Sequence, residues 1–146
     1  MFHALKGTYL EPFSEAAIDA VLARYSEIPP GCEYGFDFDH SMHGQVCRVA
    51  PDATAFELRK PGAIHLAFGV GWREPKDTPA CLRWLDRTWD LLQPFAAGRA
   101  YPNYASAEGE SAVRAAYGSN YPRLAAIKRK YDPDNVFRKN LNVLTA

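Results

Sequence analysis

The stretch YGSNYPRLAAIKRKYDPDNVF, residues 117–137, combines a glycine break, a basic helix and a helix stop. Gly118 interrupts the helical pattern, so we predict a short helix near 111–117 and a second helix over 121–131. Pro133 cannot continue the second helix, because its ring disfavours a helical conformation in the residue before it. The end of the chain is therefore predicted to be helical and sharply terminated.

The stop after the second helix is predicted to be structural. Asp132 stands directly before the proline, and Asp134 or Asn135 can satisfy local backbone donors in an Asx-type turn. Val136 and Phe137 then return the chain to the hydrophobic core. The segment contains no reactive group that its position would activate.

Upstream of these helices, the pattern favours strands separated by short turns. Strand-forming residues are grouped in the segments 2–11, 32–40, 44–49, 53–59 and 63–70. Pro51-Asp52 and Lys60-Pro61-Gly62 provide turns between the later segments. Because short connections favour antiparallel neighbours, we expect an antiparallel sheet.

Two further helices are predicted between these segments. The first begins after the N-cap Ser14, with Phe13 and Ile18 in the positions of a hydrophobic staple. Its apolar stripe is Ile18, Val21, Leu22 and Tyr25. The second has Thr78 as its cap and Pro79 in its first turn. Its apolar stripe is Leu82, Leu85, Trp89 and Leu92.

The order of these elements defines the expected fold class. One strand, one helix, further strands and then helices predict an α+β domain, an antiparallel β-sheet with helices packed on one face. The 146 residues of the chain fit a single domain. We place that domain at 1–146, with the sheet and its helices over 1–97 and a closing segment over 98–146.

Composition argues against two kinds of partner. The formal net charge is zero, whereas a dedicated nucleic-acid binder carries a basic excess. The cations at 128–130 point in different directions around their helix, which fits a solvated helix better than a basic patch. No apolar run approaches the roughly 18 residues of a membrane span. We therefore expect neither nucleic acid nor membrane as a partner.

The cysteines predict a reducing environment. Cys32, Cys47 and Cys81 are odd in number, widely spaced and without a C-x-x-C pair. This pattern fits neither a disulfide framework nor a zinc site. We expect three reduced thiols in a cytoplasmic protein.

One polar cluster offers ligands to a metal. The segment DFDHSMH, residues 37–43, contains Asp37, Asp39, His40 and His43. Carboxylates and imidazoles bind divalent cations, but this spacing fits no strong metal motif. The solvated end of a strand explains the cluster better, and no metal site is predicted.

A second polar cluster follows the long helix. The segment AYPNYAS, residues 100–106, contains Tyr101, Asn103 and Tyr104. A tyrosine phenol can serve as a general base, and an asparagine amide can pair with both donors and acceptors of a heterocycle. Tyrosine rings that only pack against the protein are the alternative.

Several motifs match one known pattern in order. They are LKGTYLEPFSEAAID at 5–19, TAFELR at 54–59, GWREP at 71–75, YPNYAS at 101–106 and AYGSNYPRLAAIKRKYDPDNVFRKNLNV at 116–143. Together they resemble the C-terminal part of the berberine-bridge-enzyme-like FAD-linked oxidoreductases, which are flavoproteins of the vanillyl-alcohol-oxidase type. The last motif is the most specific part of the resemblance.

The resemblance implies a function and a set of site residues. It implies a substrate-domain portion that covers FAD in an enzyme transferring a hydride from an alcohol or amine to the flavin. It assigns Tyr101 as the catalytic base. It places Asn103, Tyr104 and Asn142 beside the cofactor. The implied partners are FAD and a small-molecule substrate, whose identity the sequence does not specify.

The sequence also departs from the family pattern. Family members begin with an FAD-binding domain, whose glycine-rich pyrophosphate segments and covalently linking residues do not occur among these residues. Three interpretations stay open: part of an oxidoreductase that is inactive alone, half of a split enzyme that needs a separate FAD-domain chain, or a non-enzymatic module for a small ligand or protein. An unpaired sheet edge would favour a homodimer.

Overall fold

The computed structural model describes residues 1–11, 13–33, 36–96, 98, 101–103, 109–139 and 141–144, including their side chains except at 36–39. The chain divides into two compact units. The sheet unit comprises Met1–Ser41 and Gly62–Gly98, and the helical unit comprises Met42–Pro61 and Arg99–Ala146. The single domain over 1–146 stays a prediction. None of the described helices is long and apolar enough to span a membrane.

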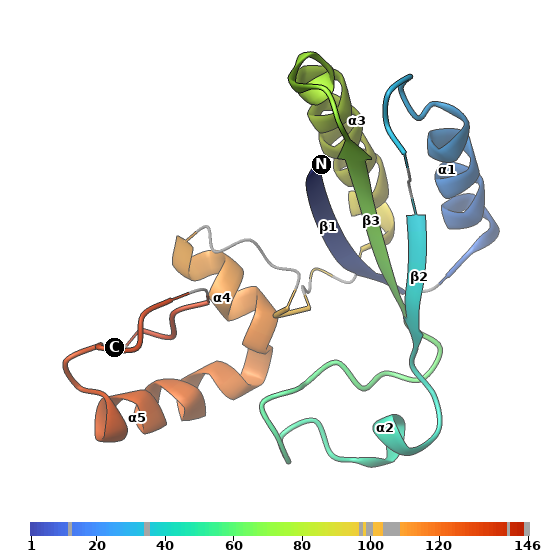
Figure 1. Ribbon diagram of the computed structural model, residues 1–146. Coiled ribbons are helices and arrows are strands. Elements are labelled where there is room, and N and C mark those ends of the chain that lie inside the picture. Colours follow the sequence, from blue (N-terminus) through green and yellow to red (C-terminus); the bar gives the residue numbers. More distant parts are fainter. Residues whose placement is uncertain are drawn as a thin grey trace. The chain divides into compact units, whose positions relative to one another are not determined.

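A three-stranded antiparallel sheet, in the order β1-β3-β2, forms the base of the sheet unit (Figure 1). The central strand β3 (Ile64–Trp72) pairs with β1 (Phe2–Leu10) over the full length of both strands. On its other side it pairs with β2 (Phe36–Ser41), with a register shift between Phe38 and His40. The strands predicted near 2–11, 32–40 and 63–70 are therefore confirmed.

Two helices, α1 (Glu15–Ser26) and α3 (Thr78–Leu92), cover one face of this sheet (Figure 1). Alternate side chains of β3 pack with both helices in one hydrophobic cluster, and these are Leu66, Phe68, Val70 and Trp72. Each large side chain buried in this way contributes about 1.5–3 kcal/mol. The expected fold class, an antiparallel sheet with helices on one face, is confirmed.

Helix α1 buries a different face from the one predicted. Ser14 caps it as expected, because its Oγ accepts a hydrogen bond from the Ala17 amide at 3.3 Å. Its buried residues are Ala17, Val21 and Arg24, whereas Ile18, Leu22 and Tyr25 are exposed. Hydrogen bonds of Arg24 explain the rotation. Its carbonyl accepts from Trp84 Nε1 at 3.0 Å, and its Nε donates to Thr88 Oγ1 at 3.2 Å.

Helix α3 also differs in detail from the prediction. A short 3-10 helix, η1 (Pro75–Asp77), precedes it, and Asp77 rather than Thr78 is its N-cap. Thr78 instead accepts a hydrogen bond from Trp72 Nε1 at 2.7 Å. Its buried residues are Cys81, Trp84, Leu85, Thr88 and Leu92, and a second 3-10 helix, η2 (Gln93–Phe95), follows it. The predicted Leu85 and Leu92 are buried, but Leu82 is exposed.

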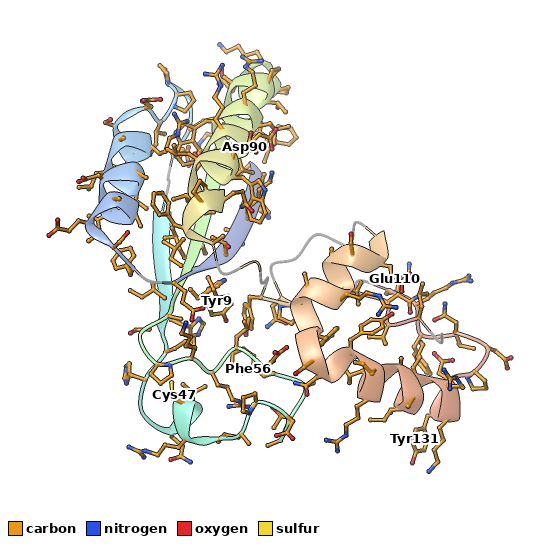
Figure 2. The ribbon with its side chains drawn as sticks, turned by 180° about the vertical axis from the view of Figure 1, so that it is seen from behind. Tyr9, Cys47, Phe56, Asp90, Glu110 and Tyr131 are labelled. Carbon is orange, nitrogen blue, oxygen red and sulfur yellow. A yellow bond between two sulfur atoms is a disulfide. The ribbon has the colours of Figure 1, made fainter. Side chains whose placement is uncertain are left out.

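The cysteine prediction is wrong for two of the three residues. Cys32 and Cys81 form a disulfide. Cys47, labelled in Figure 2, is free. The bonded pair is separated by 49 residues, so no local spacing motif marks it. Because folding brings α3 against the connection that follows α1, only the tertiary structure reveals the pair.

Two of the predicted strands fall in the helical unit, and both predictions are wrong. Residues 44–49 form a single helical turn, α2 (Gln45–Arg48), and residues 53–59 form no strand. The closing helices are confirmed as α4 (Gly109–Tyr117) and α5 (Tyr121–Tyr131), joined by a 3-10 turn, η3 (Gly118–Asn120). Their small apolar cluster consists of Val113, Tyr121 and Ala125, packed by Tyr117, Leu141 and Val143.

Candidate functional site

The loop predicted as a site brings two of its residues together. Asn103 Nδ2 donates a hydrogen bond to the Tyr101 phenol oxygen at 2.9 Å. The Tyr101 ring meets the ring of Phe56 edge to face, with centroids 6.2 Å apart and planes at 88°. Tyr104, the third predicted residue, lies outside the described residues. The described part of the loop therefore presents an oriented phenol with an amide beside it.

The partner ring, Phe56, is held by an arginine rather than by strand pairing (Figure 2). Arg59 Nε donates to the Phe56 carbonyl at 3.0 Å, and its guanidinium carbon lies 5.2 Å from the centre of the Phe56 ring. The same guanidinium donates to the Val46 carbonyl at 3.1 Å and to Thr54 Oγ1 at 2.7 Å. One planar cation thus joins Val46, Thr54 and Phe56, which helps to order TAFELR without strand pairing.

A glycine of the closing motif allows this connection to approach the helices. Glu57 Oε2 accepts a hydrogen bond from the Ser119 amide at 2.9 Å. A Cβ atom at Gly118 would overlap that carboxylate, and the residue has a φ of +49°. Only glycine meets both requirements without strain. The glycine read from sequence as a helix break is therefore also a contact point.

Asn120 and Arg123 complete the attachment. The Asn120 amide nitrogen donates to the carbonyls of Pro51 and Thr54 at 2.9 and 3.1 Å, and Arg123 Nη1 donates to the Asp52 carbonyl at 3.2 Å. A hollow of about 130 Å³ lies between this loop and α5. Asn120 and Arg123, the polar residues that α5 and its cap contribute to the hollow, already bind the loop, so we assign them a structural role.

The helix stop is built by Asp132, not by Asp134 or Asn135 as predicted. Its carboxylate accepts from the amides of Val136 at 2.8 Å and Phe137 at 3.1 Å, and it pairs with Lys128. The hydrogen bond from Lys128 is the main cause that lowers the pKa of Asp132, and the two amides act in the same direction. Val136 and Phe137 are themselves exposed, contrary to the expectation that they return to the core.

Asn142 is placed differently from the Tyr101 loop. Its neighbours Leu141 and Val143 pack on the apolar cluster of the helical unit. The Asn142 Oδ1 atom is buried and has no hydrogen-bond partner in the part of the chain that the structure describes. An unsatisfied buried acceptor is rare, because it forfeits about 1–3 kcal/mol. This atom is therefore a candidate acceptor for a donor that the chain does not supply.

The sequence analysis missed a polar row across the sheet. Tyr9 and His40 both lie opposite His65 in the strand register, on the sheet face away from α1 and α3. The ring centroids are 4.8 Å apart for Tyr9 and His65 and 5.9 Å apart for His40 and His65. His65 is fully buried and His40 is exposed. The alternation of side chains along HLAFGVGW could have placed His65 on the sheet face that does not carry Leu66 and Phe68.

The same row accounts for one residue of the possible metal cluster. The His40 ring lies beside that of His65 at an interplanar angle of 45°, while the side chains of Asp37 and Asp39 lie outside the described part. His43 follows the end of β2 and is exposed. The described residues contain no group of three or more potential metal ligands.

Comparison with known proteins gives a consistent result. Residues 100–144 match the family model described as "Berberine and berberine like". The chain is 34% identical over 119 residues to the uncharacterized FAD-linked oxidoreductase YvdP of Bacillus subtilis, which covers 82% of this chain and 26% of that protein. The matched region 100–144 contains Tyr101, Asn103 and Asn142.

Solved structures agree with the sequence relatives. BBE-like 1 of Physcomitrella patens superposes with a TM-score of 0.81 at 25% identity, over 99% of this chain and 30% of that chain. A glycopeptide hexose oxidase, solved in complex with teicoplanin, gives a TM-score of 0.80 at 25% identity, over 97% of this chain and 32% of its own. This chain therefore spans only about a quarter to a third of the length of these proteins.

Proposed function

Because this chain belongs to the berberine-bridge-enzyme-like FAD-linked oxidoreductases and corresponds to part of their length, we propose that it supplies a flavin- and substrate-facing portion of such an enzyme. The observation that carries the proposal is the position of the family match. That match, residues 100–144, contains the Tyr101–Asn103 hydrogen bond and the buried acceptor of Asn142. The hexose oxidase neighbour supports an alcohol as the reacting group.

One observation tests whether the residues fit a flavin. The Asn142 Oδ1 atom is buried without a described partner, and a ring N–H of an isoalloxazine is the kind of donor that would satisfy it. Asn103 is exposed and carries a second amide that can pair with the polar edge of the ring. Together with Tyr104, these residues are the ones that would hold the cofactor.

Bound FAD would supply the hydride acceptor for the oxidation of an alcohol or amine carbon. The task left to the chain is the substrate proton, and the phenol oxygen of Tyr101 would take it from the substrate hydroxyl. Asn103 donates to that oxygen at 2.9 Å, and the Phe56 ring contacts the tyrosine ring, so both fix the orientation of the phenol. A fixed base is worth more than a mobile one because its orientation is set before the substrate arrives.

A flavin titration tests the cofactor assignment. FAD is added to the purified chain, and the visible flavin band is followed before and after desalting. We expect a saturable spectral change that Asn142→Leu abolishes and that Gln93→Ala, an exposed amide in the sheet unit, leaves intact. An unchanged flavin spectrum with a folded wild-type chain would reject flavin contact by this chain alone.

A kinetic test addresses Tyr101 separately. In the flavin-loaded enzyme, Tyr101→Phe keeps the ring and its contact with Phe56 but removes the proton acceptor. General-base catalysis contributes about 10²–10⁴-fold, so turnover should fall by that factor with flavin affinity unchanged. Equal turnover in the variant would assign the proton to another group.

A partner chain follows from the open edges of the sheet. In the part that the structure describes, β2 pairs only with β3, and β1 pairs with β3 and forms one further bridge, from Leu10 to Ala96. Phe2 and Leu5, nearer the start of β1, are exposed. We propose that this edge binds either a separate FAD-domain chain or a second copy in a homodimer. Light scattering at high concentration decides the second case, since a clean monomer would reject the homodimer. The cytoplasmic location stays a prediction, and the Cys32–Cys81 disulfide removes the reduced-thiol argument for it.

A further inference from the structure

The disulfide between Cys32 and Cys81 joins the connection that follows α1 to helix α3. We propose that this bond is a permanent structural cross-link, formed by thiol–disulfide exchange in an oxidising compartment. The protein then completes its folding outside the reducing cytoplasm. This inference concerns the sheet unit and does not depend on the flavin assignment.

The two bonded cysteines differ from reactive cysteines in their low solvent exposure. Cys81 is 0% exposed and belongs to the hydrophobic cluster that also contains Trp84 and Leu85. Cys32 is half-buried and packs against the same cluster. Exchange requires a thiolate to reach a sulfur atom, so the fully buried Cys81 sulfur is shielded from reductants in the folded protein.

The backbone holds both partners in position independently of the bond. Cys32 forms an isolated antiparallel bridge with Trp72, and the next amide, that of Glu33, donates to the Gly71 carbonyl at 2.8 Å. Trp72 in turn donates to Thr78 at the start of α3. The Cα atoms of the two cysteines are 6.3 Å apart, a distance that disulfides normally span. The fold therefore favours this pairing before any oxidation occurs.

The third cysteine does not compete for this pairing. Cys47 belongs to α2 in the helical unit and is free (Figure 2). The odd cysteine count, which suggested reduced thiols, is thus one structural pair plus one separate thiol. An odd count does not exclude a disulfide when tertiary contacts select the pair.

Formation of the Cys32–Cys81 bond requires an oxidant, and a second disulfide can serve as that oxidant. The two thiols lose two protons and two electrons, and the S–S bond forms between Cys32 and Cys81. A protein or small-molecule disulfide accepts both electrons and both protons and leaves as two thiols. Oxidising compartments maintain such oxidants, whereas the cytoplasm keeps thiols reduced.

Thiol trapping in the organism that makes the protein tests whether the pair is oxidised where the protein accumulates. Cells and medium are quenched with acid, free thiols are alkylated under denaturing conditions, and the peptides are identified by mass spectrometry. We expect the Cys32 and Cys81 peptides to be linked in nearly all molecules, with only Cys47 alkylated. Alkylation of both Cys32 and Cys81, or a pair that includes Cys47, would overturn the proposal.

Thermal melting with and without a reductant tests the structural role. We expect the reductant to lower the melting temperature of the wild type and of Cys47→Ser by about 10 °C. The double variant Cys32→Ala with Cys81→Ala should melt at the lower temperature in both conditions. A wild-type melting temperature that does not respond to complete, verified reduction of the bond would overturn the structural role.

Discussion

The sheet unit and the helical unit are each stabilised by a different kind of internal contact. The sheet unit has a ladder of paired strands and one continuous cluster of large side chains, including Phe68 and Trp84. The helical unit has a small apolar cluster, and side chains such as Arg59 and Asn120 hold its irregular backbone. The free energy from hydrophobic burial varies gradually with the size and shape of the side chain. A hydrogen bond from a side chain to a carbonyl is lost entirely when that side chain is replaced. The comparison predicts different responses to substitution.

The largest effect is expected in the centre of the sheet unit. Phe68→Ala removes a fully buried ring that packs on the helices and leaves a cavity. Such truncations destabilise by about 3–5 kcal/mol. Urea unfolding followed by tryptophan fluorescence measures the loss, because Trp72, Trp84 and Trp89 all belong to this unit. A loss below 1 kcal/mol would contradict the core assignment.

In the helical unit, Gly118→Ala should give the next largest effect. The positive φ would be strained, and the new methyl would displace the Glu57 carboxylate from its hydrogen bond with the Ser119 amide, so we expect a loss of about 2–3 kcal/mol. Gly62→Ala is the matched control, because Gly62 also has a positive φ but no atom near the added methyl. The second change should give only the backbone strain of about 1 kcal/mol. Equal losses would show that the Glu57 contact does not matter.

Removal of one amide tests the side-chain attachment of the loop. Asn120→Ala leaves the carbonyls of Pro51 and Thr54 without their donor, and we expect a loss of about 1–3 kcal/mol. Hydrogen exchange should also rise across residues 51–59. Unchanged exchange there would mean that Arg59 alone orders the loop.

Asp132 gives the helical unit a dependence on pH. Its pKa is lowered in the folded state, mainly by the hydrogen bond from Lys128, so its contribution to stability is present above the unfolded value of about 3.9. That contribution is lost as the pH falls through the folded pKa. Asp132→Asn should remove this part of the acid sensitivity, measured as melting temperature between neutral and acidic pH. An identical acid profile in the variant would contradict the assignment.

The smallest effect is expected on the exposed face of α1. Leu22→Ser should change stability by less than about 0.5 kcal/mol, because Leu22 is 61% exposed. Val21→Ser, one position away on the buried face, should be clearly destabilising. If the two changes have equal effects on the free energy of unfolding, the observed orientation of α1 is wrong.

Predictions that rest on a local sequence pattern succeeded, and those that depend on distant side-chain contacts failed. The strand-forming residues at 63–70 and the glycine break at Gly118 predicted β3 and the closing helices, because each element there follows its local pattern. The strand predicted over 53–59 failed because the side chains of Arg59 and Asn120, not a neighbouring strand, bind the carbonyls of Phe56 and Thr54. Periodicity also assigned the wrong face of α1, since it does not count the buried Arg24 as a core residue.

The candidate site was only partly predictable. Tyr101 and Asn103, which the sequence placed in one polar cluster, are two residues apart, and a hydrogen bond joins them in the structure. Tyr9 and His65 are far apart in sequence and meet only through the register of β1 and β3. The Cys32–Cys81 pair was hidden for the same reason. Contacts set by strand register or helix packing are not encoded in any local spacing.

The division of the chain into units has a consequence for synthesis. Residues 42–61 are translated between β2 and β3, but their hydrogen-bond partners Ser119, Asn120 and Arg123 emerge later. During translation, the carbonyls of segment 42–61 therefore stay hydrated until the residues at the start of α5 have been synthesised. Contacts of such high sequence separation form slowly. We expect this segment to be the one most open to proteases and chaperones during translation.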